Sequence, residues 1–153
     1  MAGYKGHSSF NLLLALPALI ALDHFFLHSP YPLALTFSVS FAYTTLFMSP
    51  DLDLAHSIKL VSIRGVLSLP FRFYSRVFSH RGISHSFFFG SLTRIVWLFA
   101  FATLVFFLFN QELPSSSNLK KFYRTYEPFL LYGLAGICLA DWCHLLLDIK
   151  IRK

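Results

Sequence analysis

Four long apolar stretches divide the chain, and each approaches the roughly 20 residues that a membrane-spanning helix needs. They cover residues 10–27, 31–48, 87–109 and 128–147. The third stretch has the cleanest pattern, whereas Asp23 and His24 interrupt the first and Pro17 is placed to kink it. The pattern predicts an all-α polytopic membrane protein with about four transmembrane helices, in which residues 1–153 form a single helical membrane domain.

The segments between these stretches differ in character. Residues 28–32 form a short turn with two prolines and no Lys or Arg. Residues 49–86 form a long segment in which basic and apolar positions alternate, broken by Gly65 and Pro70. This alternation favours short amphipathic helices that lie along the membrane interface between the second and third spans. An ordinary connecting loop is the alternative.

Composition supports lipid as the solvent of this chain. Hydrophobic residues make up 56% of the sequence and charged residues 13%, about half the share of roughly 25% found in soluble domains. A soluble protein of 153 residues could not bury so much apolar surface. We therefore expect the lipid bilayer to be the main partner of the chain.

Positive charge predicts the orientation in the membrane. With four spans, the N-terminus, the segment 49–86 and the C-terminus share one side, which carries nine Lys and Arg residues against three on the other side. The more basic side should be cytoplasmic. A signal peptide is the alternative for the first stretch, because Lys5 precedes its apolar core, but no convincing cleavage site follows. The net charge of +6 lies beside apolar runs without a nucleic-acid motif, so we expect no nucleic acid as partner.

Potential metal ligands cluster at the ends of the predicted spans. His7 precedes the first span, and Asp51 and Asp53 follow the second. His80 and His85, with Arg81 between them, precede the third span, and His144 and Asp148 end the fourth. The predicted topology brings all four groups to the same membrane face, although it was built from apolar runs and from Lys and Arg alone. This convergence indicates a metal site on the cytoplasmic side.

Local spacing agrees with such a site. Asp141, His144 and Asp148 are spaced i, i+3 and i+7, which places them on one face of a helix. Ionisable groups inside a span are costly and usually face the interior of the protein. Mixed imidazole and carboxylate ligands suit Zn, Mn, Fe or Ni, and the number of candidates allows one or two ions per chain. Taken singly, each group also has an ordinary explanation, such as an interfacial histidine, a turn cap, an ion pair within the helix or, for Arg81, a positive-inside anchor.

Several short motifs resemble two related families. The motifs are Gly6-His7, Ser49-Pro50-Asp51-Leu52-Asp53, His80-Arg81-Gly82-Ile83-Ser84-His85-Ser86 and the stretch from His144 to Asp148. In this order they resemble the DUF2227 type of uncharacterised membrane metal-binding proteins and the YdjM-like group of inner-membrane proteins described as metal-dependent hydrolases. The resemblance implies a four-span helical protein whose His and Asp motifs bind metal. It also implies an inner, plasma or plastid-type membrane as the location. Asp141 departs from the simplest pattern, so it is open whether Asp141 is a ligand or supports one.

The expected function is metal-assisted hydrolysis of a membrane-proximal phosphoester or ester. In this hypothesis a divalent ion, with Zn favoured, activates water, Asp53 or Asp148 takes a proton, and Arg81 orients the anion. Two alternatives stand beside it: a structural metal that ties the helices together, and metal transport or sensing. The third stretch has few polar residues at its middle, which argues against a pore within one protomer, although an oligomer could supply one.

Overall fold

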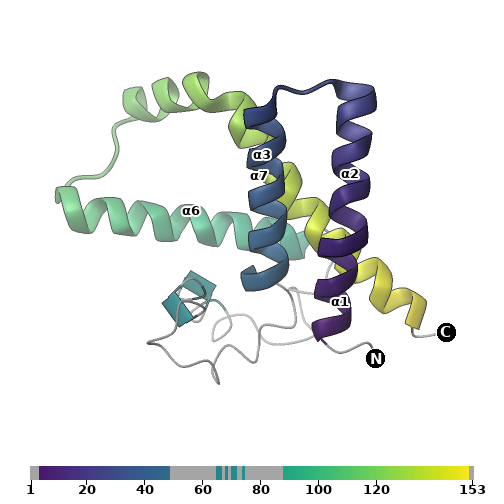
Figure 1. Ribbon diagram of the computed structural model, residues 1–153. Coiled ribbons are helices and arrows are strands. Elements are labelled where there is room, and N and C mark those ends of the chain that lie inside the picture. The colour runs from purple at the N-terminus through teal and green to yellow at the C-terminus, as the bar shows by residue number, and fades with distance from the viewer. Residues whose placement is uncertain are drawn as a thin grey trace.

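The computed structural model describes residues 4–48, 65, 66, 68, 70, 71, 74 and 88–151, and every regular element in these residues is helical. The first is a continuous rod whose α-helical parts alternate with wider π-helical turns: α1 (Tyr4–Phe10), η1 (Asn11–Ala15), α2 (Leu16–Leu22) and η2 (Asp23–Leu27). The second rod joins α3 (Tyr31–Tyr43) to η3 (Thr44–Met48), and α6 (Phe89–Asn110) and α7 (Ser116–Ile151) follow. Figure 1 shows α2 and α3 side by side, joined by a short turn.

The first rod runs through Pro17 without ending. A proline lacks the amide that would bond to the carbonyl four residues back, so it is tolerated best where that bond is already altered. Pro17 lies in the first turn of α2, directly after η1. There the amide of Leu16 donates to the carbonyl of Asn11, five residues back, as in a π turn. The rod ends where His28 adopts the left-handed conformation, with φ of 51°, and its amide donates to the carbonyl of Asp23 at 2.9 Å.

α7 begins earlier than the apolar pattern predicts. The fourth stretch was expected from residue 128, after a polar connection, yet α7 starts at Ser116. Ser115 explains the start, because its hydroxyl accepts a hydrogen bond from the amide of Asn118 at 3.3 Å, as a helix N-cap does. The polar residues that follow lie exposed on the first turns of the helix, so hydropathy alone could not identify them as helical.

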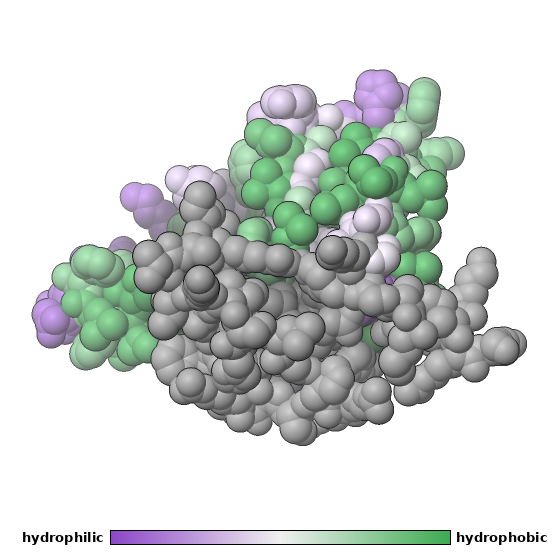
Figure 2. All heavy atoms as spheres, turned by 60° about the horizontal axis from the view of Figure 1, so that its bottom comes forward, coloured by the Kyte–Doolittle hydropathy of each residue, from purple (hydrophilic) through white to green (hydrophobic). Residues whose placement is uncertain are grey.

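Within the described residues, four helices are long and apolar enough to cross a membrane: Gly6–Leu27, Tyr31–Met48, Phe89–Asn110 and Ser116–Leu147. Their bounds agree with the four predicted stretches, except that the first helix starts at Gly6 instead of residue 10 and the fourth starts at Ser116 instead of residue 128. Large apolar side chains cover much of their outer surface, and Phe109 is 84% exposed. Figure 2 shows this apolar surface on one face of the molecule, where hydrophobic residues, in green, cover most of the coloured area. Such a surface suits contact with lipid.

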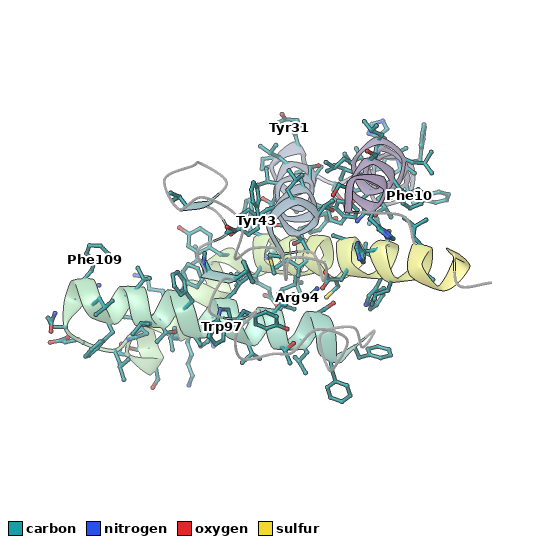
Figure 3. All side chains as sticks on the ribbon, turned by 90° about the horizontal axis from the view of Figure 1, so that it is seen from below. Phe10, Tyr31, Tyr43, Arg94, Trp97 and Phe109 are labelled. Carbon is teal, nitrogen blue, oxygen red and sulfur yellow. The ribbon has the colours of Figure 1, made fainter. Side chains whose placement is uncertain are left out.

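The helices do not form a simple up-and-down bundle. In Figure 1, α6 runs across the view while α2 and α3 run up and down it. The buried residues of α6 are Gly90, Ser91 and Arg94, all within its first two turns. Its other end reaches away from the remaining helices, as the position of Phe109 in Figure 3 shows. The first turns of α6 therefore carry most of its attachment.

Two apolar clusters hold the helices together. One joins the first rod, α3 and α7 around Ala15, Phe37, Phe41 and Ala140. The other joins Met48 to Phe71 and Tyr74, with Tyr43, Trp97, Leu98 and Ile137 packed against it.

Most of the predicted interfacial segment 49–86 lies outside the described residues. The described part packs on α6: the indole of Trp97 donates to the carbonyl of Pro70 at 2.7 Å, and the hydroxyls of Tyr74 and Thr93 lie 2.8 Å apart. These contacts bind the segment to the same end of α6 that is buried.

Candidate metal centre

Two of the predicted ligands, from opposite ends of the chain, lie against one another. His7 was expected to precede the first span, but it lies within α1, inside the apolar helix Gly6–Leu27. His144 lies in the last third of α7. Both side chains are buried, at 2% and 3% exposure, and their ring centroids are 4.3 Å apart with an interplanar angle of 35°. The fold thus brings together two imidazoles that the sequence places far apart.

Asn11 joins the three helices that surround this pair. It follows His7 by one helical turn, and its side-chain nitrogen donates to the hydroxyl of Thr45 at 3.2 Å and to the carbonyl of Ala140 at 3.1 Å. Ala140 precedes His144 by one turn of α7. The amide of Asn11 therefore fixes α1 against α7 one turn away from each histidine, and it ties both to η3.

The oxygen of the same amide is a buried acceptor. The carbonyl of Ala140 can only accept, so the side-chain nitrogen of Asn11 must face it and the orientation of the amide is fixed. Oδ1 is then left without a hydrogen-bond partner in the described chain, although the residue is only 1% exposed. A buried acceptor without a partner costs about 1–3 kcal/mol, so this oxygen is suited to an imidazole N–H or a cation.

Asn11 was missed when the sequence was read for His and Asp motifs. The available signal was a polar residue inside an apolar helix, one turn after a candidate ligand.

A buried ion pair lies next to His144. Nη1 of Arg94 contacts Oδ1 of Asp141 at 2.5 Å, and the hydroxyl of Ser91 donates to Oδ2 at 2.9 Å. Arg94 and Asp141 are each 2% exposed. Figure 3 places Arg94 between α6 and α7. The sequence left open whether Asp141 is a ligand or a supporting residue; here it forms an ion pair with Arg94.

The other predicted site residues fall largely outside the described residues. These are Asp51, Asp53, His80, Arg81 and His85. Asp148 follows His144 by one turn of α7, and only its backbone is described. Within the part of the chain that the structure describes, no three His, Cys, Asp or Glu side chains lie close enough to hold an ion together. The described part therefore supplies two histidines of a possible larger ligand set.

The histidine pair fits a metal ion by distance and chemistry. With Zn–N bonds of about 2.0–2.1 Å and tetrahedral angles, two imidazoles on one ion hold their centroids roughly 5 Å apart. The 4.3 Å between the rings of His7 and His144 is within about 1 Å of that value. Neutral imidazole is also a common ligand of Zn, Cu, Fe and Ni.

Comparison with known proteins gives one match. The sequence model of a family described as "Uncharacterized metal-binding protein (DUF2227)" matches residues 4–153. No curated protein and no solved structure matches the chain.

Proposed function

The chain belongs to the DUF2227 family of uncharacterised metal-binding proteins, and from this premise we propose that it is an integral membrane protein with a divalent-metal centre at one membrane face. The observation that carries the proposal is the contact between His7 and His144. The two imidazoles come from opposite ends of the chain, are buried, and lie 4.3 Å apart. Burial of two neighbouring imidazoles is costly unless hydrogen bonds or a metal ion satisfy their nitrogens.

The proposed ligand set combines this pair with the sequence motifs. The further ligands are the five candidates that the motifs supply: Asp51, Asp53, His80, His85 and Asp148. Zn is the favoured ion, with Mn, Fe or Ni as alternatives, in one or two copies per chain. We assign Asp141 a supporting role beside His144 and not a ligand role, because Arg94 and Ser91 already bind its carboxylate oxygens.

The proposed location follows from the four apolar helices and from the distribution of charge. Residues 1–153 would form one helical domain with both termini and the metal centre on the cytoplasmic side. For α6 to cross the bilayer together with the other helices, it must turn about the contacts of its first turns. Those turns hold its buried residues, and Trp97 and Leu98 in the next turn pack against Phe71 and Tyr74.

The proposed activity is hydrolysis of a membrane-proximal phosphoester or ester. A bound divalent ion supplies Lewis acidity and a more acidic water. In this proposal Asp53 or Asp148 takes a proton and the guanidinium of Arg81 orients an anionic substrate. The proposed activity is supported by the resemblance of the Pro-Asp-x-Asp and His-Arg-Gly-x-Ser-His motifs to those of YdjM-like proteins. Both this relationship and the activity stay predictions.

A structural metal is the second candidate function. His7 and His144 belong to the first and last helices and are both buried, so an ion held by them would join the two ends of the chain. A structural ion of this kind contributes directly to the free energy of folding.

Elemental analysis of the protein purified in detergent tests the metal centre. Wild type should carry stoichiometric metal, and His144→Ala and His85→Ala should each lose most of it. His24→Ala is the matched control, because His24 is exposed in η2 near the other end of the first rod. Wild-type protein that holds no metal, even after metal is added back, would exclude the centre.

Arg81→Ala separates the two candidate functions. Hydrolysis predicts metal-dependent turnover of a phosphoester panel by wild type, which this variant loses while it keeps its metal. A structural ion predicts no turnover by either protein, and a large fall in melting temperature of both when a chelator is added.

A further inference from the structure

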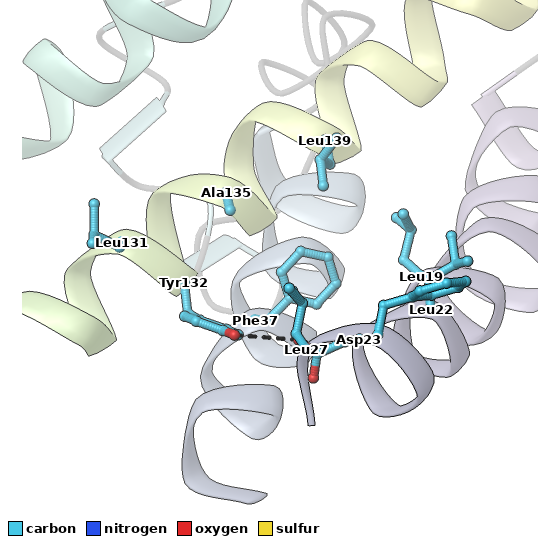
Figure 4. A pocket seen from close by; sticks show the side chains of 10 residues that line it. Leu19, Leu22, Asp23, Leu27, Phe37, Leu131, Tyr132, Ala135 and Leu139 are labelled. Atoms are coloured by element: carbon cyan, nitrogen blue, oxygen red, sulfur yellow. Dashed lines mark hydrogen bonds between the residues drawn. The ribbon is translucent and has the colours of Figure 1, made fainter. Parts of the chain in front are cut away.

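A groove lies between the first rod, α3 and α7, away from the histidine pair. It encloses about 440 Å³, within the range of roughly 300–1,000 Å³ typical of ligand pockets. Figure 4 shows its apolar wall, to which Leu19, Leu22, Phe37, Ala135 and Leu139 contribute. The groove therefore has the size and lining of a site for a hydrocarbon chain.

One end of the groove is polar and acidic. Oδ1 of Asp23 accepts hydrogen bonds from the hydroxyls of Ser29 at 2.7 Å and Tyr132 at 3.3 Å, and these two hydroxyls also contact each other. Figure 4 shows the bond between Tyr132 and Asp23. Both bonds go to Oδ1, and within the described residues no basic side chain forms an ion pair with Asp23. The carboxylate is thus positioned by hydroxyl groups while its negative charge stays available to a cation.

The order of polar and apolar groups matches the order within a lipid leaflet. Asp23 and Ser29 lie where the first rod ends and the chain turns toward α3, which is a membrane interface in the proposed topology. Leu19 lies one turn of the first rod deeper, and Leu139 lies two turns of α7 beyond Tyr132. A lipid bound with its headgroup at Asp23 would run its chain toward the middle of the membrane.

The groove is separate from the candidate metal centre. Sixteen residues of continuous helix separate His7 from Asp23, which corresponds to roughly 24 Å at 1.5 Å per residue. The acidic end of the groove therefore faces the leaflet opposite the metal centre, so it does not deliver substrate to that centre.

We propose that this groove binds an acyl chain of a phospholipid from the leaflet opposite the metal centre, with a primary ammonium headgroup paired to Asp23. A primary ammonium supplies both a positive charge and N–H donors, whereas an anionic headgroup would be repelled. The proposal rests on the membrane location proposed above and is independent of the metal and of hydrolysis.

Native mass spectrometry of the protein in detergent, with matched acyl chains on each lipid, tests the site. We expect wild type to retain phosphatidylethanolamine at least about threefold more strongly than phosphatidylglycerol, as a partly exposed ion pair allows. Asp23→Asn should retain both lipids equally. Ala135→Phe should fill the groove and lose binding of both, because Ala135 is exposed on its wall. The matched control is Ala102→Phe, at an exposed position of α6.

Each part of the proposal has its own contrary result. Lipid retention by Ala135→Phe equal to that of Ala102→Phe would exclude the groove as the site. A preference for phosphatidylethanolamine that survives Asp23→Asn would exclude the headgroup pairing. Extraction of the chain from membranes by alkaline carbonate would contradict the membrane location itself, and elemental analysis would separately decide the metal centre.

Discussion

Buried polar side chains collect where the first rod, η3 and the last third of α7 meet. Asn11, His7 and His144 lie on one side of this junction, and Arg94 with Asp141 lie on the other, next to His144. Polar groups of this kind are expensive in apolar helices and usually serve a function. Their concentration at one junction supports the same location for the candidate metal centre.

Replacement of Asn11 by Ala should weaken metal binding as well as folding. The variant loses the bonds to Thr45 and Ala140, which we expect to lower the free energy of unfolding by about 1–3 kcal/mol. If Oδ1 also supports a ligand, metal affinity should fall about 10–100-fold, as for other residues that orient ligands. Metal titration and thermal melting measure the two effects. Asn110→Ala, at the exposed end of α6, is the control.

Metal affinity that stays at the wild-type value in Asn11→Ala, while the melting temperature falls, would assign Asn11 a purely structural role.

Replacement of Arg94 by Leu should leave Asp141 as a buried charge without its partner. We expect a loss of about 3–5 kcal/mol in the free energy of unfolding, and recovery of much of it when Asp141→Leu is added. Arg124→Leu, at an exposed position of α7, should have little effect. Unfolding in mild detergent measures the wild type, these variants and Asp141→Leu alone. If Asp141→Leu alone were as stable as wild type, the pair would not contribute to the stability of the α6–α7 contact.

Sequence reasoning was most effective for residues that topology alone brings together. Apolar runs and the positions of Lys and Arg predicted that His7 and His144 arrive at one membrane face, and the fold does bring them into contact. The partner of Asp141 stayed open, because helical spacing gives the face of a helix but not the neighbour opposite it. Asn11 was missed because its partners, Thr45 and Ala140, lie on other helices.

At the scale of elements, α3 and α7 form the closest contact between helices. A Cβ atom at Gly136 would lie 2.7 Å from the carbonyl oxygen of Phe37, whereas one at Gly133 would lie 3.5 Å from the nearest atom, in Ser40. Small residues allow helix backbones to approach in this way within membranes. Apolar patterns predicted both helices, but they cannot show which glycine lies at the point of closest approach.

Gly136→Ala should destabilise the protein, although Gly→Ala inside a helix normally stabilises it by roughly 0.5–1 kcal/mol. The new methyl group must push α3 away from α7, which typically costs about 1–3 kcal/mol. Gly133→Ala is the matched control, since its Cβ would make ordinary contact with Ser40, and it should leave the melting temperature equal or higher. Equal melting temperatures for both variants would contradict this account of the contact.

At the scale of the whole molecule, the metal centre and the lipid groove would lie at opposite ends of the first rod. Both sites include a residue of α7. The metal centre uses His144 in the last third of the helix, and the groove uses Tyr132 near its middle. Phe71 and Tyr74, described residues of the segment 49–86, pack with Met48 and with Trp97 and Leu98 of α6. The apolar pattern predicted the four long apolar helices of the described residues, but not the direction of α6. The outer surface of α6 is apolar all round and does not select a packing face.

Cysteine labelling in intact membrane vesicles tests whether all four helices cross the bilayer. In a background with Cys138→Ala and Cys143→Ala, we expect Tyr31→Cys and Glu112→Cys to react with a membrane-impermeant maleimide from the side opposite the C-terminus, because both residues are exposed near turns on that side of the proposed topology. Lys153→Cys should react only after permeabilisation. Labelling of Glu112→Cys only together with Lys153→Cys would mean that α6 does not cross the bilayer. The two basic segments that flank α6 would then lie on the same face. The assignment of the metal centre to the cytoplasmic side, which depends on their separation, would lose its basis.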